Sequence, residues 1–147
     1  MISRATAADL DDIRAALQRV QLPVTGLEED RARVYLIRRN DRLQGVIGYD
    51  DYAPHAVLRA FVTLSRRQGH GRRLLHHVLR EIYLQGFEDA YALTTTIPDW
   101  LLALGFVEIS AADLPSTVRQ SSDFSARLTP AARCFRIDRP TLAHCAD

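Results

Sequence analysis

The chain has 147 residues, of which 47% are hydrophobic and 25% charged, a composition typical of one globular domain with a buried core. Its formal net charge is only +1, so we expect no nucleic-acid partner. All nineteen basic residues are arginines, which excludes a lysine Schiff base and a phosphate-binding loop of the Walker type, because both require lysine.

Hydrophobic periodicity along the chain alternates between the spacing of a strand and that of a helix. Thr6 and Asp9 have the spacing of a helix N-cap, and apolar residues then recur at three- and four-residue intervals from Leu10 to Val20. In chain order we expect a strand at 2–4, this helix, a hairpin of 34–39 and 43–49, a strand at 56–64, a helix that ends before Gly86, a strand at 91–96, a short helix at 98–104 and a strand at 106–109.

The last part of the chain has weaker patterns. Pro115 is expected to start a helical turn, residues 119–132 are polar and typical of a loop, and residues 134–137 have the composition of a final strand. Strands that alternate with helices predict a mixed α/β (α+β) domain.

The segment RRQGHGRR, residues 66–73, lies between the strand at 56–64 and an amphipathic helix. The first N–H groups of a helix have no partner within the helix, so they attract anions, and Gly69 and Gly71 would let a bulky phosphate approach the backbone. A pyrophosphate fits this description. The alternative is that the two glycines only turn the chain and the arginines are solvated.

This segment carries a resemblance to a known superfamily. Arg66, Gly69 and Gly71, after a strand and before an amphipathic helix, resemble the acetyl-CoA pyrophosphate loop of the GNAT N-acetyltransferases. The resemblance extends to the order of elements and to LALGF at 102–106. It implies one GNAT domain over residues 1–147, with a mostly antiparallel mixed sheet of six to seven strands, helices on both faces, and a splay between strands four and five.

A narrower resemblance concerns the small GNAT proteins of arsenic resistance. It rests on LPVTGLE (22–28), VLRAF (57–61), LTTT (93–96) and the tail at 113–134. Within the tail, the matching positions are Arg119, Phe124, Leu128, Pro130 and Cys134. Some members of this group acetylate arsenical or phosphinic analogues of amino acids, and the resemblance implies the same class of substrate.

The resemblance also implies where acetyl-CoA, the co-substrate, would bind. Backbone N–H groups of a splayed strand lack partners and can stabilise the oxyanion of acetyl transfer. The expected CoA contacts are Phe61, Val62 and Thr63 on the strand and Arg66, Arg67, Gln68, Gly69, His70, Gly71 and Arg72 at the loop and helix. Many GNAT enzymes carry a tyrosine acid four residues before the late glycine, where this chain has Leu101.

Candidates for the acceptor side are less specific. His55 has a suitable intrinsic pKa for a base, although a histidine in a surface turn usually has no such role. Thr94 and Thr95 could hold the thiol or substrate or simply favour a strand. Arg59 lies in an otherwise apolar strand, so it should bind an anionic acceptor, unless it pairs with a structural acid such as Asp50 or Asp51 or points to solvent from a sheet edge. Simple alternation would place Arg59 and Phe61 on the same face.

We therefore expect an acetyl-CoA-dependent N-acetyltransferase that acts on a small amino-acid-like amine. A non-catalytic acyl-CoA-binding module is the alternative, because Leu101 replaces the usual acid. Cys134 and Cys145 are too few for a disulfide scaffold and have no metal-ligand spacing, so we expect reduced thiols and no metal. The N-terminus lacks a signal-peptide pattern and no apolar run reaches membrane-spanning length, so we expect a cytoplasmic monomer or homodimer without membrane contact.

Overall fold

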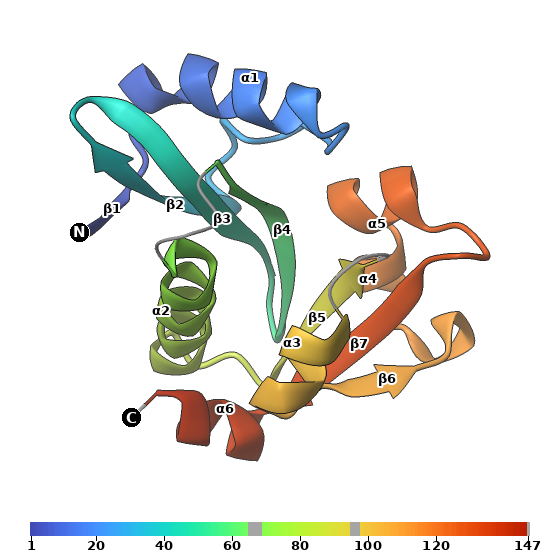
Figure 1. Ribbon diagram of the computed structural model, residues 1–147. Helices are drawn as coiled ribbons and strands as arrows, with labels where there is room; N and C mark the ends of the chain where they lie inside the picture. The colour runs from blue at the N-terminus through green and yellow to red at the C-terminus, as the bar shows by residue number, and fades with distance from the viewer. Residues whose placement is uncertain (65–68, 95–97, 147) are drawn as a thin grey trace.

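A seven-stranded sheet organises the part of the chain that the computed structural model describes, residues 1–64, 69–94 and 98–146 (Figure 1). The strand order is β1-β2-β3-β4-β5-β7-β6, and every neighbouring pair is antiparallel except the parallel pair β4 and β5. The strands are β1 (Ile2–Arg4), β2 (Ala32–Arg39), β3 (Arg42–Tyr52), β4 (His55–Thr63), β5 (Asp89–Thr94), β6 (Val107–Ile109) and β7 (Arg133–Asp138).

Helices cover both faces of this sheet (Figure 1). The α-helices are α1 (Leu10–Arg19), α2 (His70–Leu84), α3 (Pro98–Leu104), α4 (Ser116–Arg119), α5 (Ser122–Arg127) and α6 (Arg139–Cys145), and two short 3-10 turns are Ala7–Asp9 and Ala111–Asp113. Among the described residues, no helix is both long enough and apolar enough to cross a bilayer.

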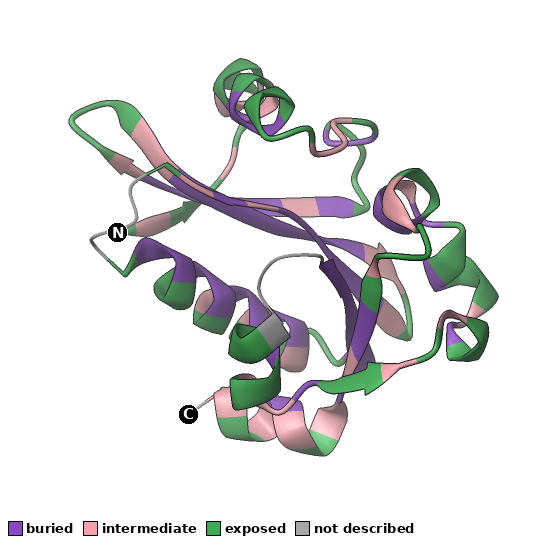
Figure 2. Cartoon of the chain, turned by 45° about the vertical axis from the view of Figure 1, so that its right-hand side comes forward, coloured by how far each residue is buried: buried purple, intermediate pink, exposed green. Residues whose placement is uncertain are grey.

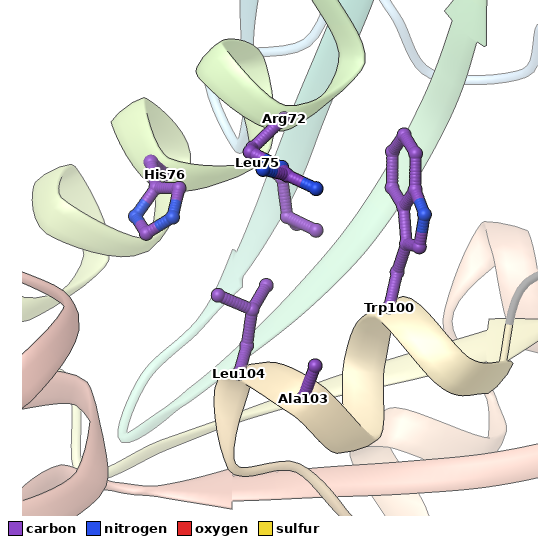
Figure 3. Close-up of a pocket in the computed structure, with 6 residues that line it drawn as sticks. All are labelled: Arg72, Leu75, His76, Trp100, Ala103 and Leu104. Carbon is purple, nitrogen blue, oxygen red and sulfur yellow. The ribbon is translucent and has the colours of Figure 1, made fainter. Parts of the chain in front are cut away.

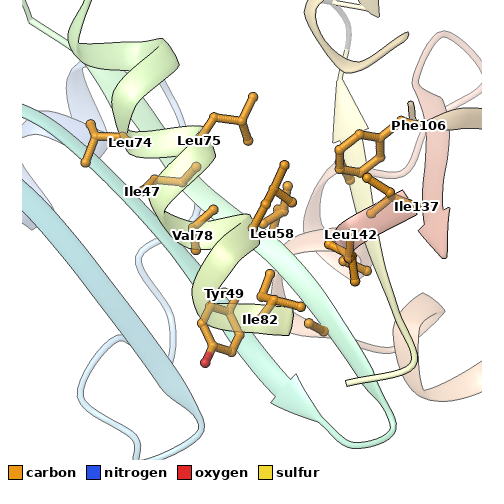
Figure 4. Packing of buried hydrophobic residues seen from close by; sticks show 14 of the residues in the cluster. Ile47, Tyr49, Leu58, Leu74, Leu75, Val78, Ile82, Phe106, Ile137 and Leu142 are labelled. Atoms are coloured by element: carbon orange, nitrogen blue, oxygen red, sulfur yellow. The ribbon is translucent and has the colours of Figure 1, made fainter. Parts of the chain in front are cut away.

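The two faces are held by separate apolar clusters. On one face, α2 packs Leu74, Leu75, Val78 and Ile82 over the middle of the sheet, together with α3 and α6 (Figure 4). The other face carries two clusters, one under α1 and one under α4 and α5. Buried residues therefore run along the central strands, while the outer sides of the helices are exposed (Figure 2).

Strands β4 and β5 pair over a short stretch only. His55, Ala56 and Val57 lie opposite Asp89, Ala90 and Tyr91, and pairing ends there. Beyond this point β4 stays paired with β3 as far as Thr63, and β5 stays paired with β7 as far as Thr94. The two strands are therefore held apart by their outer neighbours, and the expected splay between strands four and five is present.

A bulge in β4 changes the direction of its side chains. The register with β3 shifts between Val46 and Gly48, and Ala60 takes a φ of 59°, which is uncommon for alanine. Phe61 packs against the cluster under α2, whereas Arg59 faces the side of α1 and α5. The alternation that placed Arg59 and Phe61 on one face was therefore wrong, because the extra residue at the bulge reverses the pattern.

Most predicted elements are confirmed, including the helical turn after Pro115 and the final strand at 134–137, and the differences lie in residues 119–132 and after β7. Residues 119–132 were expected to be a loop, yet they contain the end of α4 and all of α5. The Ser121 hydroxyl caps α5 by accepting the N–H of Phe124, whose ring is fully buried. Helix α6 was not predicted; the carboxylate of Asp138 begins it by accepting the N–H of Thr141 at 3.0 Å.

Candidate active site

The parting of β4 and β5 opens a cavity of about 410 Å³ through the middle of the sheet. One wall is β4 and the other is the end of β5. Residues of β3, α2, α3 and α5 and of the segment after α1 complete the lining. The described residues that line it are Val20, Leu22, Ile47, Leu58, Arg59, Ala60, Phe61, Val62, Thr63, Leu75, Ala92, Leu93, Thr94, Leu101 and Arg127. The cavity is mostly apolar, and its charged lining residues are both arginines.

The residues that the sequence analysis predicts to bind an oxyanion lie on β4 beside this opening. Phe61, Val62 and Thr63 all line the cavity. Antiparallel pairing uses the backbone groups of β4 that point toward β3, and β5 no longer lies beside this part of β4. The groups that point away from β3 therefore face the opening, where they can bind a carbonyl oxygen or an extended ligand.

Helix α2 begins next to this opening. Gly69 precedes its first residue with a φ of 68°, a left-handed conformation that glycine adopts without strain. A Cβ atom placed on Gly71 would lie 3.0 Å from the Trp100 ring and 3.2 Å from the methyl group of Thr63. The predicted phosphate contacts Gly69, His70, Gly71 and Arg72 thus start this helix, whereas Arg66, Arg67 and Gln68 lie outside the described residues.

His70 is buried at the first turn of α2. Neither ring nitrogen has a hydrogen-bond partner among the described residues, and the residue is 5% exposed. Burial and the nearby guanidinium groups of Arg73 and Arg39 lower the pKa of His70 below the usual imidazole value. The ring is therefore uncharged at neutral pH, and the positive field at this helix end comes from the backbone and the arginines.

A second cavity, of about 310 Å³, lies between α2 and α3. Figure 3 shows Trp100, Ala103 and Leu104 on α3 opposite Arg72, Leu75 and His76 on α2. Leu75 lines both cavities, and the Trp100 ring lies 6.4 Å from the Phe61 ring on β4. Trp100 therefore stands between the start of α2 and the opening in the sheet.

Arg59 forms a buried ion pair on the α1 and α5 side of the cavity. Its Nη1 donates to Asp50 Oδ2 at 3.2 Å, and its Nη2 donates to the carbonyl of Pro23 at 3.2 Å. The side chains of Arg59 and Asp50 are 1% and 3% exposed, and Nε of Arg59 has no partner within residues 1–64, 69–94 and 98–146. Burial raises the pKa of Asp50, and the charge of Arg59 opposes that rise. The arginine thus has the structural acid that the sequence offered as one alternative, and it also lines the cavity.

The remaining predicted residues lie at different distances from the opening. Thr94 and Leu101 line the cavity and are buried, and Thr95 lies outside the described residues. His55 lies at the other end of β4, where its Nδ1 is 2.6 Å from Asp89 Oδ1. Phe61 lies six positions after His55, about 20 Å along a strand, so the structure does not bring the two together.

Arg127 is a cavity residue that the sequence analysis did not single out. It is the last residue of α5, in a segment predicted to be a loop, and nothing in the local pattern shows that the loop returns to β5. Its Nη1 donates to Asp123 Oδ2 at 2.8 Å and its Nη2 donates to the carbonyl of Leu93 at 3.2 Å. Asp123 is 1% exposed, and burial raises its pKa against the opposing charge of Arg127.

No protein-family model and no curated protein sequence matches the chain. Solved structures do match its fold. N-acetylglutamate synthase from Neisseria gonorrhoeae, complexed with coenzyme A and N-acetyl-glutamate, superposes with a TM-score of 0.77 at 20% identity over 94% of this chain. The match spans 35% of the synthase, so the chain corresponds to about a third of that protein.

Two further structures match over nearly the whole length of both chains. A GNAT-family acetyltransferase from Staphylococcus aureus has a TM-score of 0.76 at 16% identity, covering 95% of this chain and 98% of its own. The ribosomal-protein-S18-alanine N-acetyltransferase from Escherichia coli has a TM-score of 0.70 at 20% identity, covering 94% and 92%. The chain therefore has the GNAT fold, with its mixed sheet and its splayed parallel pair of strands.

Proposed function

We propose that the chain is an acetyl-CoA-dependent N-acetyltransferase that acts on a small amino-acid-like amine. The observation that carries the proposal is the opening between β4 and β5 beside the start of α2. Solved proteins of this fold include one complexed with coenzyme A and an N-acetylated amino acid. The site here combines a helix end suited to phosphates with a strand edge suited to a thioester.

The two ends of acetyl-CoA would use different parts of the site. Gly69, with open space where a Cβ would lie, leaves the start of α2 accessible to the pyrophosphate, and the missing Cβ of Gly71 lets Trp100 and Thr63 pack against this turn. Arg66, Arg67, Gln68, His70 and Arg72 would surround the phosphates. The pantetheine arm would pass Trp100 and reach β4, where a backbone N–H between Phe61 and Thr63 would donate a hydrogen bond to the thioester oxygen as negative charge develops on it. The backbone would do most of this binding, since exposed arginines contribute little individually.

The acceptor would enter from the other face of the sheet, the side of α1 and α5. The cavity there is lined by Arg59, and a guanidinium group suits a carboxylate, phosphinate or arsinate. The neutral amine attacks the acetyl carbon in a ternary complex, and the carbon–sulfur bond then breaks to release the CoA thiolate. The resemblance to the arsenic-resistance group supports an arsenical or phosphinic amino-acid analogue as one acceptor.

Proton transfer in this proposal does not use a side-chain acid on α3. Leu101 is 3% exposed and lines the cavity, so the usual position presents an aliphatic group. Water near Thr94 and Thr95 is proposed to take the proton that the attacking nitrogen loses and to deliver a proton to the thiolate. His55 is bound to Asp89 far from the opening, so this mechanism does not use it.

The proposal is tested by acetyl transfer itself. The protein is mixed with acetyl-CoA and a panel of amino acids, amino-acid analogues and simple amines, and the release of free CoA thiol is followed. Release that depends on an acceptor, with an acetylated product detected by mass, supports the enzyme. Tight acetyl-CoA binding without turnover over the panel would instead support the acyl-CoA-binding module, which the aliphatic Leu101 favours.

A further inference from the structure

The acceptor side of the cavity has two arginines, and they approach it from different elements. Arg59 comes from β4, and Arg127 comes from the end of α5, which lies near β5 (Figure 1). Arg127 is fixed to β5 by its bond to the Leu93 carbonyl. Both residues are among those that line the opening between β4 and β5, and their side chains are 1% and 25% exposed. One cavity therefore has an arginine on each side of the splay.

The acids that pair with these arginines do not face the cavity. Asp50 and Asp123 are 3% and 1% exposed, and neither is among the residues that line the opening. Among the described lining residues, the charged side chains are Arg59 and Arg127 alone. Each arginine is thus held by a buried acid that does not line the cavity, and the charged residues that do line it are cationic.

Both guanidinium groups keep hydrogen-bonding capacity. Each of them makes one bond to a carboxylate and one to a backbone carbonyl, and a guanidinium group carries more N–H groups than two bonds use. In addition, Nε of Arg59 is buried without a partner in the part of the chain that the structure describes, as is the acceptor Oδ1 of Asp123, which does not line the cavity. Buried donors are normally satisfied, so a cavity with these groups favours a ligand with oxygen acceptors.

We propose that Arg127 is a specificity-determining residue that binds, together with Arg59, the carboxylate or equivalent oxyanion of the acceptor. The assignment rests on the proposed acetyltransferase function. It predicts an acceptor whose amine and oxyanion are only a few bonds apart, because the guanidinium groups and the β4 edge line the same cavity. A merely structural Arg127, which only neutralises Asp123, would not distinguish acceptors.

The test compares acceptors that differ only in charge. The common L-α-amino acids and their α-carboxamides are offered at saturating acetyl-CoA, and kcat/KM is measured for each pair. The wild type should prefer the acid. In Arg127→Gln the acid-to-amide ratio of kcat/KM should fall by about 10- to 100-fold, the range for lost hydrogen bonds to a charged group, mainly through a higher KM for the acid.

Two further variants control for stability. Arg127→Gln leaves the Asp123 carboxylate buried without its partner, so the double variant Arg127→Gln/Asp123→Asn removes both charges and should show the same loss of preference. Arg133→Gln is the matched control, because Arg133 is a half-exposed arginine paired with Glu108 on the β6–β7 edge, and it should keep the wild-type ratio.

The outcomes separate this assignment from the function on which it rests. Turnover with no preference for the acid in the wild type, or an unchanged preference in both Arg127 variants, overturns the role of Arg127 and leaves the acetyltransferase intact. An absence of turnover with every acceptor overturns the proposed function and this assignment with it. A reduced ratio in the Arg127 variants, with a normal ratio in Arg133→Gln, establishes the assignment.

Discussion

Replacing Arg59 by alanine is expected to destabilise the protein strongly. In the wild type the Asp50 side chain is 3% exposed and lies 3.2 Å from the guanidinium group, and the change leaves it without this cationic partner. Removing one member of a buried ion pair typically costs about 3–5 kcal/mol, because the remaining charge is desolvated and unpaired. A domain of this size is stable by only about 5–15 kcal/mol, so the variant should lose a large share of its stability.

Urea unfolding followed by circular dichroism measures the loss of unfolding free energy. In a thermal melt, at about 2–4 °C per kcal/mol, the melting temperature should fall by about 6–20 °C. Arg14→Ala is the control, because Arg14 makes a surface pair with Glu28 at 3.3 Å with 35% and 60% of the two side chains exposed. That pair should contribute less than about 1 kcal/mol.

A double variant tests the physical reason. Arg59→Met with Asp50→Asn removes both charges, and it should recover much of the lost stability, since replacing both members of a buried pair is often nearly neutral. If Arg59→Ala lost no more stability than Arg14→Ala, the pair would not be desolvated as the structure indicates. Because Arg59→Ala should unfold readily, Arg59→Lys is the better variant for measuring acceptor KM.

Three further predictions concern the other end of the site and the fold. Gly71→Leu should weaken CoA binding by about 10- to 100-fold, because its side chain would overlap the Trp100 ring. Gly86→Ala, at the far end of α2 with open space around it, should not weaken CoA binding. Calorimetric titration that gives wild-type CoA affinity for Gly71→Leu would contradict this site. Trp100 is the sole tryptophan and is 42% exposed, so its fluorescence should change as CoA binds, and an unchanged spectrum at saturating CoA would place the ligand elsewhere. Bonds from the hydroxyl and N–H of Thr141 hold the pKa of Asp138 below its usual value of 3.8, so its stabilisation of α6 is present above that pH and is lost as the pH falls through the lowered value. Asp138→Ala should therefore cost about 1 kcal/mol in urea unfolding at pH 7 and clearly less in strong acid; an equal cost at both would show that the charge is not involved.

The sequence predicted the phosphate end of the site because the necessary signals are local. Two glycines directly before an apolar helical pattern mark a strand-to-helix junction, and Gly69 does take the left-handed conformation there. The opening in the sheet came only from the resemblance, since it depends on which strands pair with β4 and β5. His55 seemed close to a substrate by its position in a turn, but the parallel pairing of β4 and β5 begins at that end.

The acceptor side was less predictable because nonlocal packing decides it. Ala60 adopts a left-handed φ, which alanine rarely does, so no local sequence pattern predicted the bulge that places Arg59 and Phe61 on different faces. The polar composition of 119–132 indicated a loop, whereas burial of Phe124 and the Ser121 cap make a short helix. Arg127 could be recognised as a cavity residue only once that helix was seen beside β5.

The most direct test of the central claim is a crystal structure of the protein with acetyl-CoA. We expect the pyrophosphate at the first turn of α2, against Gly69 and Gly71, and the acetyl carbonyl oxygen within hydrogen-bonding distance of a β4 N–H between Phe61 and Thr63. An acetyl group bound outside the opening between β4 and β5, or crystals that take up no acetyl-CoA at saturating concentration, would contradict it.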